Sequence, residues 1–144
     1  MLTLANLACG CVGIVCTFAY PKVQPIIFAL IGCVFDYLDG FAARRLDAQS
    51  KLGLELDSLA DLITSGVFPS VVMYQVLVKT TGGNEIIPFF AFSIAIFSAY
   101  RLAKFNVSSD QKENFIGLPT PACGLFLIGL PLIGGTLGGY IHNT

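Results

Sequence analysis

Charged residues are scarce in this chain of 144 residues: only 12% are Asp, Glu, Lys or Arg, whereas 55% are hydrophobic. Soluble domains carry about a quarter charged residues, so this composition is typical of a protein embedded in a membrane. The formal net charge is -1, which gives no excess of basic residues for a nucleic-acid partner. The positions of the few charges therefore carry more information than their sum.

Tryptophan is absent, His142 is the only histidine, and none of the five cysteines forms a Cys-x-x-Cys pair. The sequence therefore offers no ligand pattern suited to zinc. The cysteines lie mostly within apolar runs, where we interpret them as small buried residues. The first apolar run lacks a preceding basic segment and a cleavage pattern, so we interpret it as a membrane helix rather than a secretory signal.

Five apolar stretches fill nearly the whole chain, and each has about the 20 residues that a helix needs to cross a bilayer. They cover residues 2–20, 25–43, 55–78, 86–104 and 118–140. We therefore expect an all-α fold: a polytopic bundle of five transmembrane helices in a single domain, 1–144. The last stretch is rich in glycine and ends abruptly, which leaves open a missing sixth helix and a truncated carboxy terminus.

The basic residues predict how the bundle is oriented, because cytoplasmic loops retain Lys and Arg. Six of the eight lie in or beside the second and fourth loops: Arg44, Arg45, Lys51, Arg101, Lys104 and Lys112. This distribution predicts a cytoplasmic amino terminus and places both of these loops on the cytoplasmic side.

Four aspartates are the most informative residues, since an acid near the centre of a membrane helix costs about 2.5–3.5 kcal/mol. Asp36 and Asp39 are three residues apart and Asp57 and Asp61 are four apart, so each pair shares one helix face. A short loop joins the two helices, and we expect the pairs to face each other near the cytoplasmic boundary.

Carboxylates gathered in this way favour Mg²⁺ or Mn²⁺, with Ca²⁺ as an alternative. A pair of such ions suits phosphoryl chemistry, because it stabilises charge on a leaving oxygen. The alternative is a set of helix-end aspartates solvated at the interface.

The aspartates belong to a longer pattern, which runs from Asp36 through Asp39, Gly40, Ala43 and Arg44 to Gly53, Asp57 and Asp61. The spacing matches the signature of the CDP-alcohol phosphatidyltransferases, and the chain resembles that family. The resemblance implies an enzyme that joins a CDP-activated lipid to an alcohol and releases CMP. It implies that the four aspartates hold the metal ions, that Asp61 is also the general base, and that CDP contacts Gly40, Ala43, Arg44 and Gly53.

Flanking segments resemble those of phosphatidylserine synthases, which implies CDP-diacylglycerol and L-serine as substrates. They are residues 2–10, 100–106 and 117–122. Arg101 and Lys104 supply cations for the carboxylate of serine, or anchor their helix by reaching the interface. Asn106 contacts the acceptor or caps a turn.

Thr3 and Asn6 lie one turn apart in the first apolar stretch. They line the CDP site or bond a neighbouring helix. The resemblance further implies a homodimer in the cell (inner) membrane, with the active site facing the cytoplasm.

Other readings remain open at this point. A related enzyme of the same family would use glycerol 3-phosphate or inositol as the acceptor. Intramembrane acids also occur in cation transporters and channels, although these would place them near the midplane. An inactive membrane fragment is the third alternative.

Overall fold

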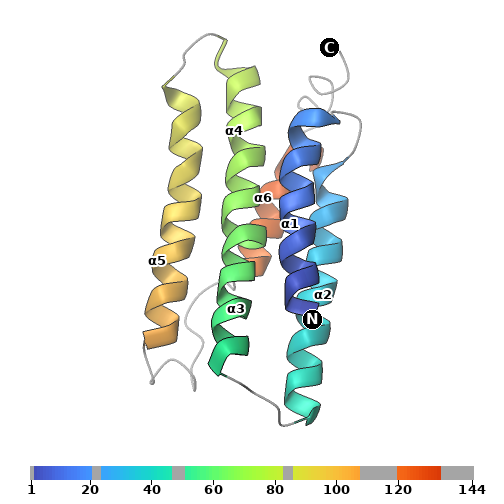
Figure 1. The fold of residues 1–144 in the computed structure, drawn as a ribbon. Helices are drawn as coiled ribbons and strands as arrows, with labels where there is room; N and C mark the ends of the chain where they lie inside the picture. Colours follow the sequence, from blue (N-terminus) through green and yellow to red (C-terminus); the bar gives the residue numbers. More distant parts are fainter. Residues whose placement is uncertain (1, 21–23, 47–50, 83–85, 108–119, 134–144) are drawn as a thin grey trace.

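The computed structural model describes residues 2–20, 24–46, 51–82, 86–107 and 120–133, and within them all regular structure is helical (Figure 1). The helices form five rods that pack into a bundle, which confirms the predicted all-α fold. The first two are α1 (Leu2–Ala19) and α2 (Pro25–Leu46). The third rod consists of α3 (Lys51–Asp61), η1 (Leu62–Val67) and α4 (Phe68–Thr80). The fourth consists of η2 (Ile87–Phe92) and α5 (Ser93–Val107), and the fifth is α6 (Thr120–Ile133).

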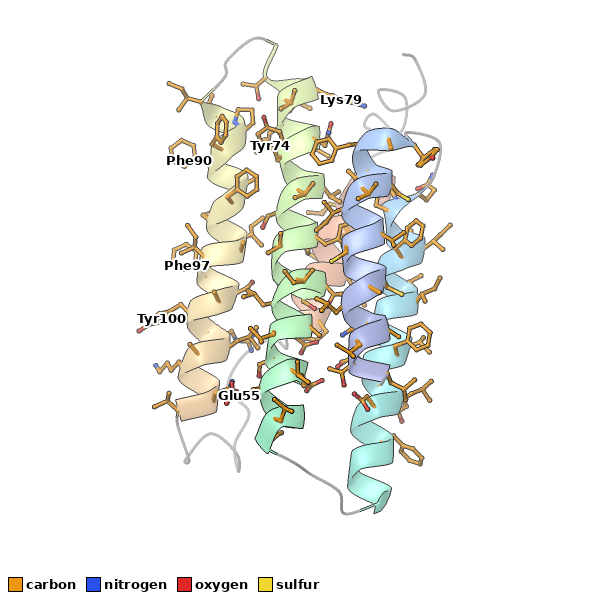
Figure 2. The ribbon with its side chains drawn as sticks, viewed as in Figure 1. Glu55, Tyr74, Lys79, Phe90, Phe97 and Tyr100 are labelled. Carbon is orange, nitrogen blue, oxygen red and sulfur yellow. The ribbon has the colours of Figure 1, made fainter. Side chains whose placement is uncertain are left out.

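Three of the described helical rods are long and apolar enough to cross a membrane: Leu2–Ala19, Leu52–Thr80 and Ile87–Lys104. Large apolar side chains cover the outside of the bundle, as expected for a surface in contact with lipid. Figure 2 shows Phe90, Phe97 and Tyr100 pointing away from the other helices, and each is about 70% exposed. The chain is an integral membrane protein.

Two predicted boundaries were wrong. Residues 44–51 were expected to form a loop, but α2 continues through Leu46, so Arg44 lies in a helix. The segment Ala42–Leu46 consists of strong helix formers, which explains the extension. The fourth rod likewise continues to Val107, so Asn106 belongs to α5 rather than to a turn. Of the predicted 118–140 segment, the described helix covers Thr120–Ile133.

The third rod contains a π-helical segment that the sequence analysis did not predict. In η1 the hydrogen bonds span five residues: the backbone N–H of Phe68 donates to the carbonyl of Ile63. Pro69 follows immediately and has no backbone N–H to donate to the carbonyl four residues earlier, at Ser65. A proline at this place therefore favours a widened turn directly before it, and π-helical turns are frequent at functional sites.

The apolar core lies beyond this widened turn and joins α2, α4 and α6. It consists of Ala29, Phe68, Val72 and Ile128. The ring of Phe68 is fully buried and reaches α1 at Gly13, where an added Cβ would lie 2.6 Å from the ring. Only a glycine at this position allows α1 to approach so closely.

Candidate active site

Three of the predicted aspartates interact electrostatically with one another across two helices. Asp36 on α2 interacts with Asp57 and Asp61 on α3, and Asp57 and Asp61 also interact. Asp39, one turn beyond Asp36, interacts with Asp36 and Asp57. The fold therefore brings the two pairs of carboxylates into one neighbourhood.

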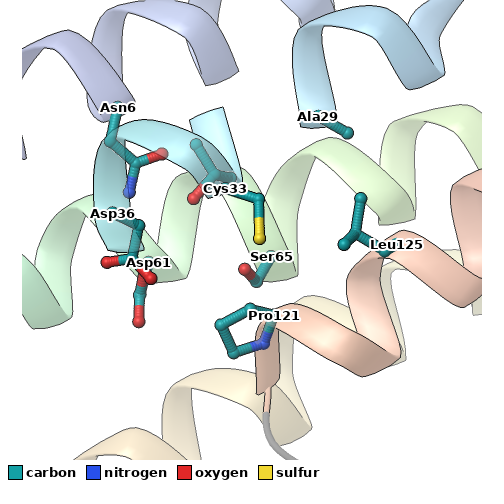
Figure 3. A pocket seen from close by; sticks show the side chains of 9 residues that line it. Asn6, Ala29, Cys33, Asp36, Asp61, Ser65, Pro121 and Leu125 are labelled. Carbon is teal, nitrogen blue, oxygen red and sulfur yellow. The ribbon is translucent and has the colours of Figure 1, made fainter. Parts of the chain in front are cut away.

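Asp36 and Asp61 line a pocket at the level of η1 (Figure 3). Residues from α1, α2, the third rod and α6 complete its wall. Oxygen atoms dominate its polar groups, and the part of the chain that the structure describes contributes no Lys or Arg side chain to the wall. The lining residues are Asn6, Ala29, Cys33, Asp36, Asp61, Thr64, Ser65, Pro121 and Leu125.

Asn6 is the most unusual of these residues. Its side chain is 1% exposed, and among the described residues neither its Nδ2 nor its Oδ1 has a partner within the usual hydrogen-bond geometry. Its amide points toward Asp36 and Asp61 in Figure 3, and it interacts with the Asp61 carboxylate. Burying a polar atom without a hydrogen bond costs about 1–3 kcal/mol, and a ligand that bonds to this amide would offset that cost.

Thr3, one turn before Asn6, has a different role in the structure. Its hydroxyl Oγ1 donates a hydrogen bond to Oδ2 of Asp39. This contact joins α1 to α2, as the helix-bonding alternative for Thr3 predicts, and it orients a carboxylate at the edge of the site.

Asn106 at the end of α5 also bonds to another helix. Its Nδ2 lies 3.0 Å from Oγ of Ser58, and the Ser58 hydroxyl lies 3.3 Å from Oδ1 of Asn106. Ser58 directly follows Asp57, so the pair ties the end of α5 to the carboxylate-bearing face of α3.

The other predicted contact residues lie outside the pocket wall. Gly40 and Gly53 are exposed, as is Lys104, while Arg101 is partly exposed. Ala43 and Arg44 fall within α2, but their side chains lie outside the described residues.

The carboxylates are neighbours without forming a closed metal cage. Among the described side chains, no three Asp, Glu, His or Cys residues are spaced to hold a metal ion. Four carboxylates in one neighbourhood repel each other unless they are neutralised by a cation or a proton. Their number and all-oxygen chemistry nevertheless suit a hard divalent cation.

The sequence analysis missed Ser65, Thr64, Cys33 and Pro121 as pocket residues. The small Thr-Ser-Gly run that begins three residues after Asp61, within an otherwise apolar stretch, was an available signal. Pro121 was included only within the flanking segment 117–122, and its place in the pocket wall depends on how α6 packs.

Comparison with known proteins identifies the family. The profile described as CDP-alcohol phosphatidyltransferase matches residues 1–143. The chain belongs to the CDP-alcohol phosphatidyltransferase family. This confirms the resemblance drawn from the aspartate signature and makes the chain an enzyme of that family.

Curated relatives in this family share one printed name, CDP-diacylglycerol--serine O-phosphatidyltransferase. The chain is 38% identical to the one from Bacillus subtilis over 128 residues, which are 89% of this chain and 71% of that protein. It is 33% identical to the Helicobacter pylori protein over 132 residues, 89% of this chain and 54% of that protein. For Mycobacterium bovis the identity is 35% over 139 residues, 90% of this chain and 46% of that protein.

The chain thus spans about half the length of the Helicobacter and Mycobacterium relatives. No solved structure matched the chain.

Proposed function

We propose that this phosphatidyltransferase moves the phosphatidyl group of CDP-diacylglycerol to the hydroxyl of L-serine, giving phosphatidylserine and CMP. The observation that carries the proposal is the convergence of Asp36 and Asp61 on one pocket. The family assignment and the shared name of the relatives support the choice of donor and acceptor.

The reaction is a direct displacement at phosphorus. The serine oxygen forms a bond to the lipid-side phosphorus of CDP-diacylglycerol, and the bond from that phosphorus to the bridging oxygen breaks. CMP leaves with that bond pair, and Asp61 accepts the proton of the serine hydroxyl. Asp61 suits this role because it lines the pocket and general-base catalysis requires a carboxylate within reach of the proton.

Asp36, Asp39, Asp57 and Asp61 would hold the divalent metal, Mg²⁺ or Mn²⁺, as a pair of ions. Bound there, the metal supplies positive charge that offsets the negative charge growing on the leaving phosphate. Thr3 holds Asp39 through its hydrogen bond, and this is the kind of outer contact that orients metal ligands.

CDP lies along the exposed glycine face of the two acidic helices, at Gly40 and Gly53 with Ala43 and Arg44. The exposure of both glycines supports this placement, because a backbone without side chains allows close approach of a nucleotide. Arg101, Lys104 and Asn106 form the side that receives the carboxylate of serine. The hydrogen bond from Asn106 to Ser58 supports placing this end of α5 beside the acidic helices.

The enzyme works in the cell membrane with its site facing the cytoplasm, and as a homodimer. The excess of basic residues in the second and fourth loops supports this orientation.

The test measures CMP release from CDP-diacylglycerol by purified protein in mixed micelles containing Mg²⁺ or Mn²⁺. L-serine, glycerol 3-phosphate and inositol are compared as acceptors. We expect serine-dependent release that a chelator abolishes and added metal restores.

Asp61→Asn should lower the serine-dependent rate at least about 100-fold, the usual contribution of a general base. Glu55→Gln is the matched control, because Glu55 lies on the same helix, is exposed and is outside the pocket wall. Release with another acceptor would retain the family and refute serine as the substrate. Equal rates for both variants would refute the role of Asp61.

A further inference from the structure

The hydrogen-bonding capacity of Asn6 indicates which kind of ligand group the pocket beside Asp61 can bind. This amide is 1% exposed and lines the pocket. It interacts with the Asp61 carboxylate, which an amide does through its Nδ2 donor, whereas its Oδ1 has no hydrogen-bond donor among the described residues. A ligand that enters the pocket with an N–H or O–H group can supply that donor and offset the cost of burying the oxygen.

The polar atoms around Asn6 are chiefly acceptors. Ser65 lines the same pocket and is 7% exposed, and no hydrogen bond to its hydroxyl is seen among the described residues. Thr64 already donates its hydroxyl proton to the carbonyl of Ala60, which leaves its oxygen as an acceptor. With the Asp36 and Asp61 carboxylates, the wall is rich in oxygen and has no basic side chain among its described residues.

Such a wall matches a group with several N–H donors and a positive charge. The amide Oδ1 of Asn6 and the hydroxyl oxygen of Ser65 can each accept one hydrogen bond from an ammonium group. These two oxygens are uncharged, so they keep this capacity when a cation neutralises the carboxylates.

We propose that Asn6 and Ser65 bind the ammonium group of the amino-alcohol acceptor, which places the acceptor hydroxyl beside Asp61. The inference rests on the proposed function and extends it to the orientation of serine. The ammonium group lies toward α1 and η1, and the carboxylate lies toward α5. Asn6 therefore contacts the acceptor rather than CDP. The exposed Gly40 and Gly53, where we place CDP, do not belong to the pocket wall that contains Asn6.

Two analogues of serine separate its charged groups. Ethanolamine keeps the ammonium group without the carboxylate, and 3-hydroxypropanoate keeps the carboxylate without the ammonium group. Their inhibition constants against serine are measured in the CMP-release assay for the wild type, Asn6→Leu and Ser65→Ala. Inhibition is measurable whether or not an analogue reacts.

We expect Asn6→Leu to raise the KM of serine and the inhibition constant of ethanolamine at least tenfold, about 1.4 kcal/mol. Ser65→Ala should raise both by a smaller factor. The inhibition constant of 3-hydroxypropanoate should change less than threefold, and so should the KM of CDP-diacylglycerol. Thr17→Val is the matched control on α1, because the one hydrogen bond of its hydroxyl seen in the described part of the chain stays within that helix, to the carbonyl of Gly13.

Three results would overturn the inference. The first is an equal rise for both analogues, which would mean that the variants disturb the whole site. The second is a rise in the KM of CDP-diacylglycerol alone, which would mean that Asn6 binds CDP rather than the acceptor. The third is a wild-type enzyme that ethanolamine does not inhibit. A wild-type enzyme without serine-dependent release would instead refute the proposed function itself.

Discussion

Gly124 on α6 offers a sharp test of how the pocket is held. An added Cβ at this position would lie 2.9 Å from Cα and 3.0 Å from the carbonyl oxygen of Ser65. Both atoms belong to the backbone, so no side-chain rotation can relieve the contact. Comfortable carbon contacts need about 3.5 Å or more, and α6 would have to move away from η1 by roughly 0.5 Å.

We expect Gly124→Ala to lower the free energy of unfolding by about 1–3 kcal/mol, the usual cost of overpacking a close contact. Gly129→Ala is the matched control on the same helix. Its added Cβ would lie 3.7 Å from Cδ1 of Ile26, an ordinary contact. Because alanine favours helices over glycine, this control should leave the stability unchanged or raise it slightly.

The activity of Gly124→Ala should fall more than its stability implies. Pro121 lines the pocket one turn before Gly124, so a displaced α6 carries part of the pocket wall with it. Misplacement of a site by about 1 Å can cost about 100-fold in rate. The assays are reversible denaturation in mixed micelles and serine-dependent CMP release at a temperature where both variants are folded. Equal stability and equal rates for the two variants would refute the packing argument.

Three further predictions concern contacts around the site. Thr3→Val should raise the Mg²⁺ or Mn²⁺ concentration needed for half-maximal activity at least several-fold, because the hydrogen bond that orients Asp39 is lost. Thr3→Ser keeps the hydroxyl and should leave that concentration unchanged, and equal metal titrations for the two variants would contradict the prediction. Ser58→Ala and Asn106→Ala should be non-additive in unfolding free energy by about 0.5–1.5 kcal/mol, and strict additivity in the double-mutant cycle would contradict their hydrogen bond. Pro69→Ala restores a backbone donor and should favour a regular α-helix through η1, so turnover should fall at unchanged stability; a fully active variant would argue against a functional π turn.

The sequence predicted the parts of this fold that depend on local length and hydropathy. A membrane helix needs about 20 apolar residues, and five such stretches correspond to the five observed rods. The polar residues Arg44 and Arg45 suggested a loop, yet arginine is a strong helix former and α2 includes both. Polarity therefore did not mark the end of this helix.

The candidate site was predictable to the extent that it follows helix periodicity. Asp57 and Asp61 share a face because they are four residues apart, and this needs no knowledge of packing. Asn6 and Ser65 line the same pocket only because α1 and η1, about 60 residues apart in the chain, both contribute to its wall. Packing between residues so far apart leaves no periodic pattern in a single sequence.

The polar pocket lies next to close contacts between helices, and this placement has a physical reason. A site that positions a hydroxyl against a carboxylate must hold its groups within about 0.5 Å. In a lipid environment no hydrophobic force presses helices together, so precision must come from close backbone contacts. Gly13 against Phe68 and Gly124 against Ser65 provide two such contacts, from α1 and from α6. Ser65 lies within the widened turn and Phe68 directly follows it, so both contacts hold the segment that departs from regular α-helical geometry beside Asp61.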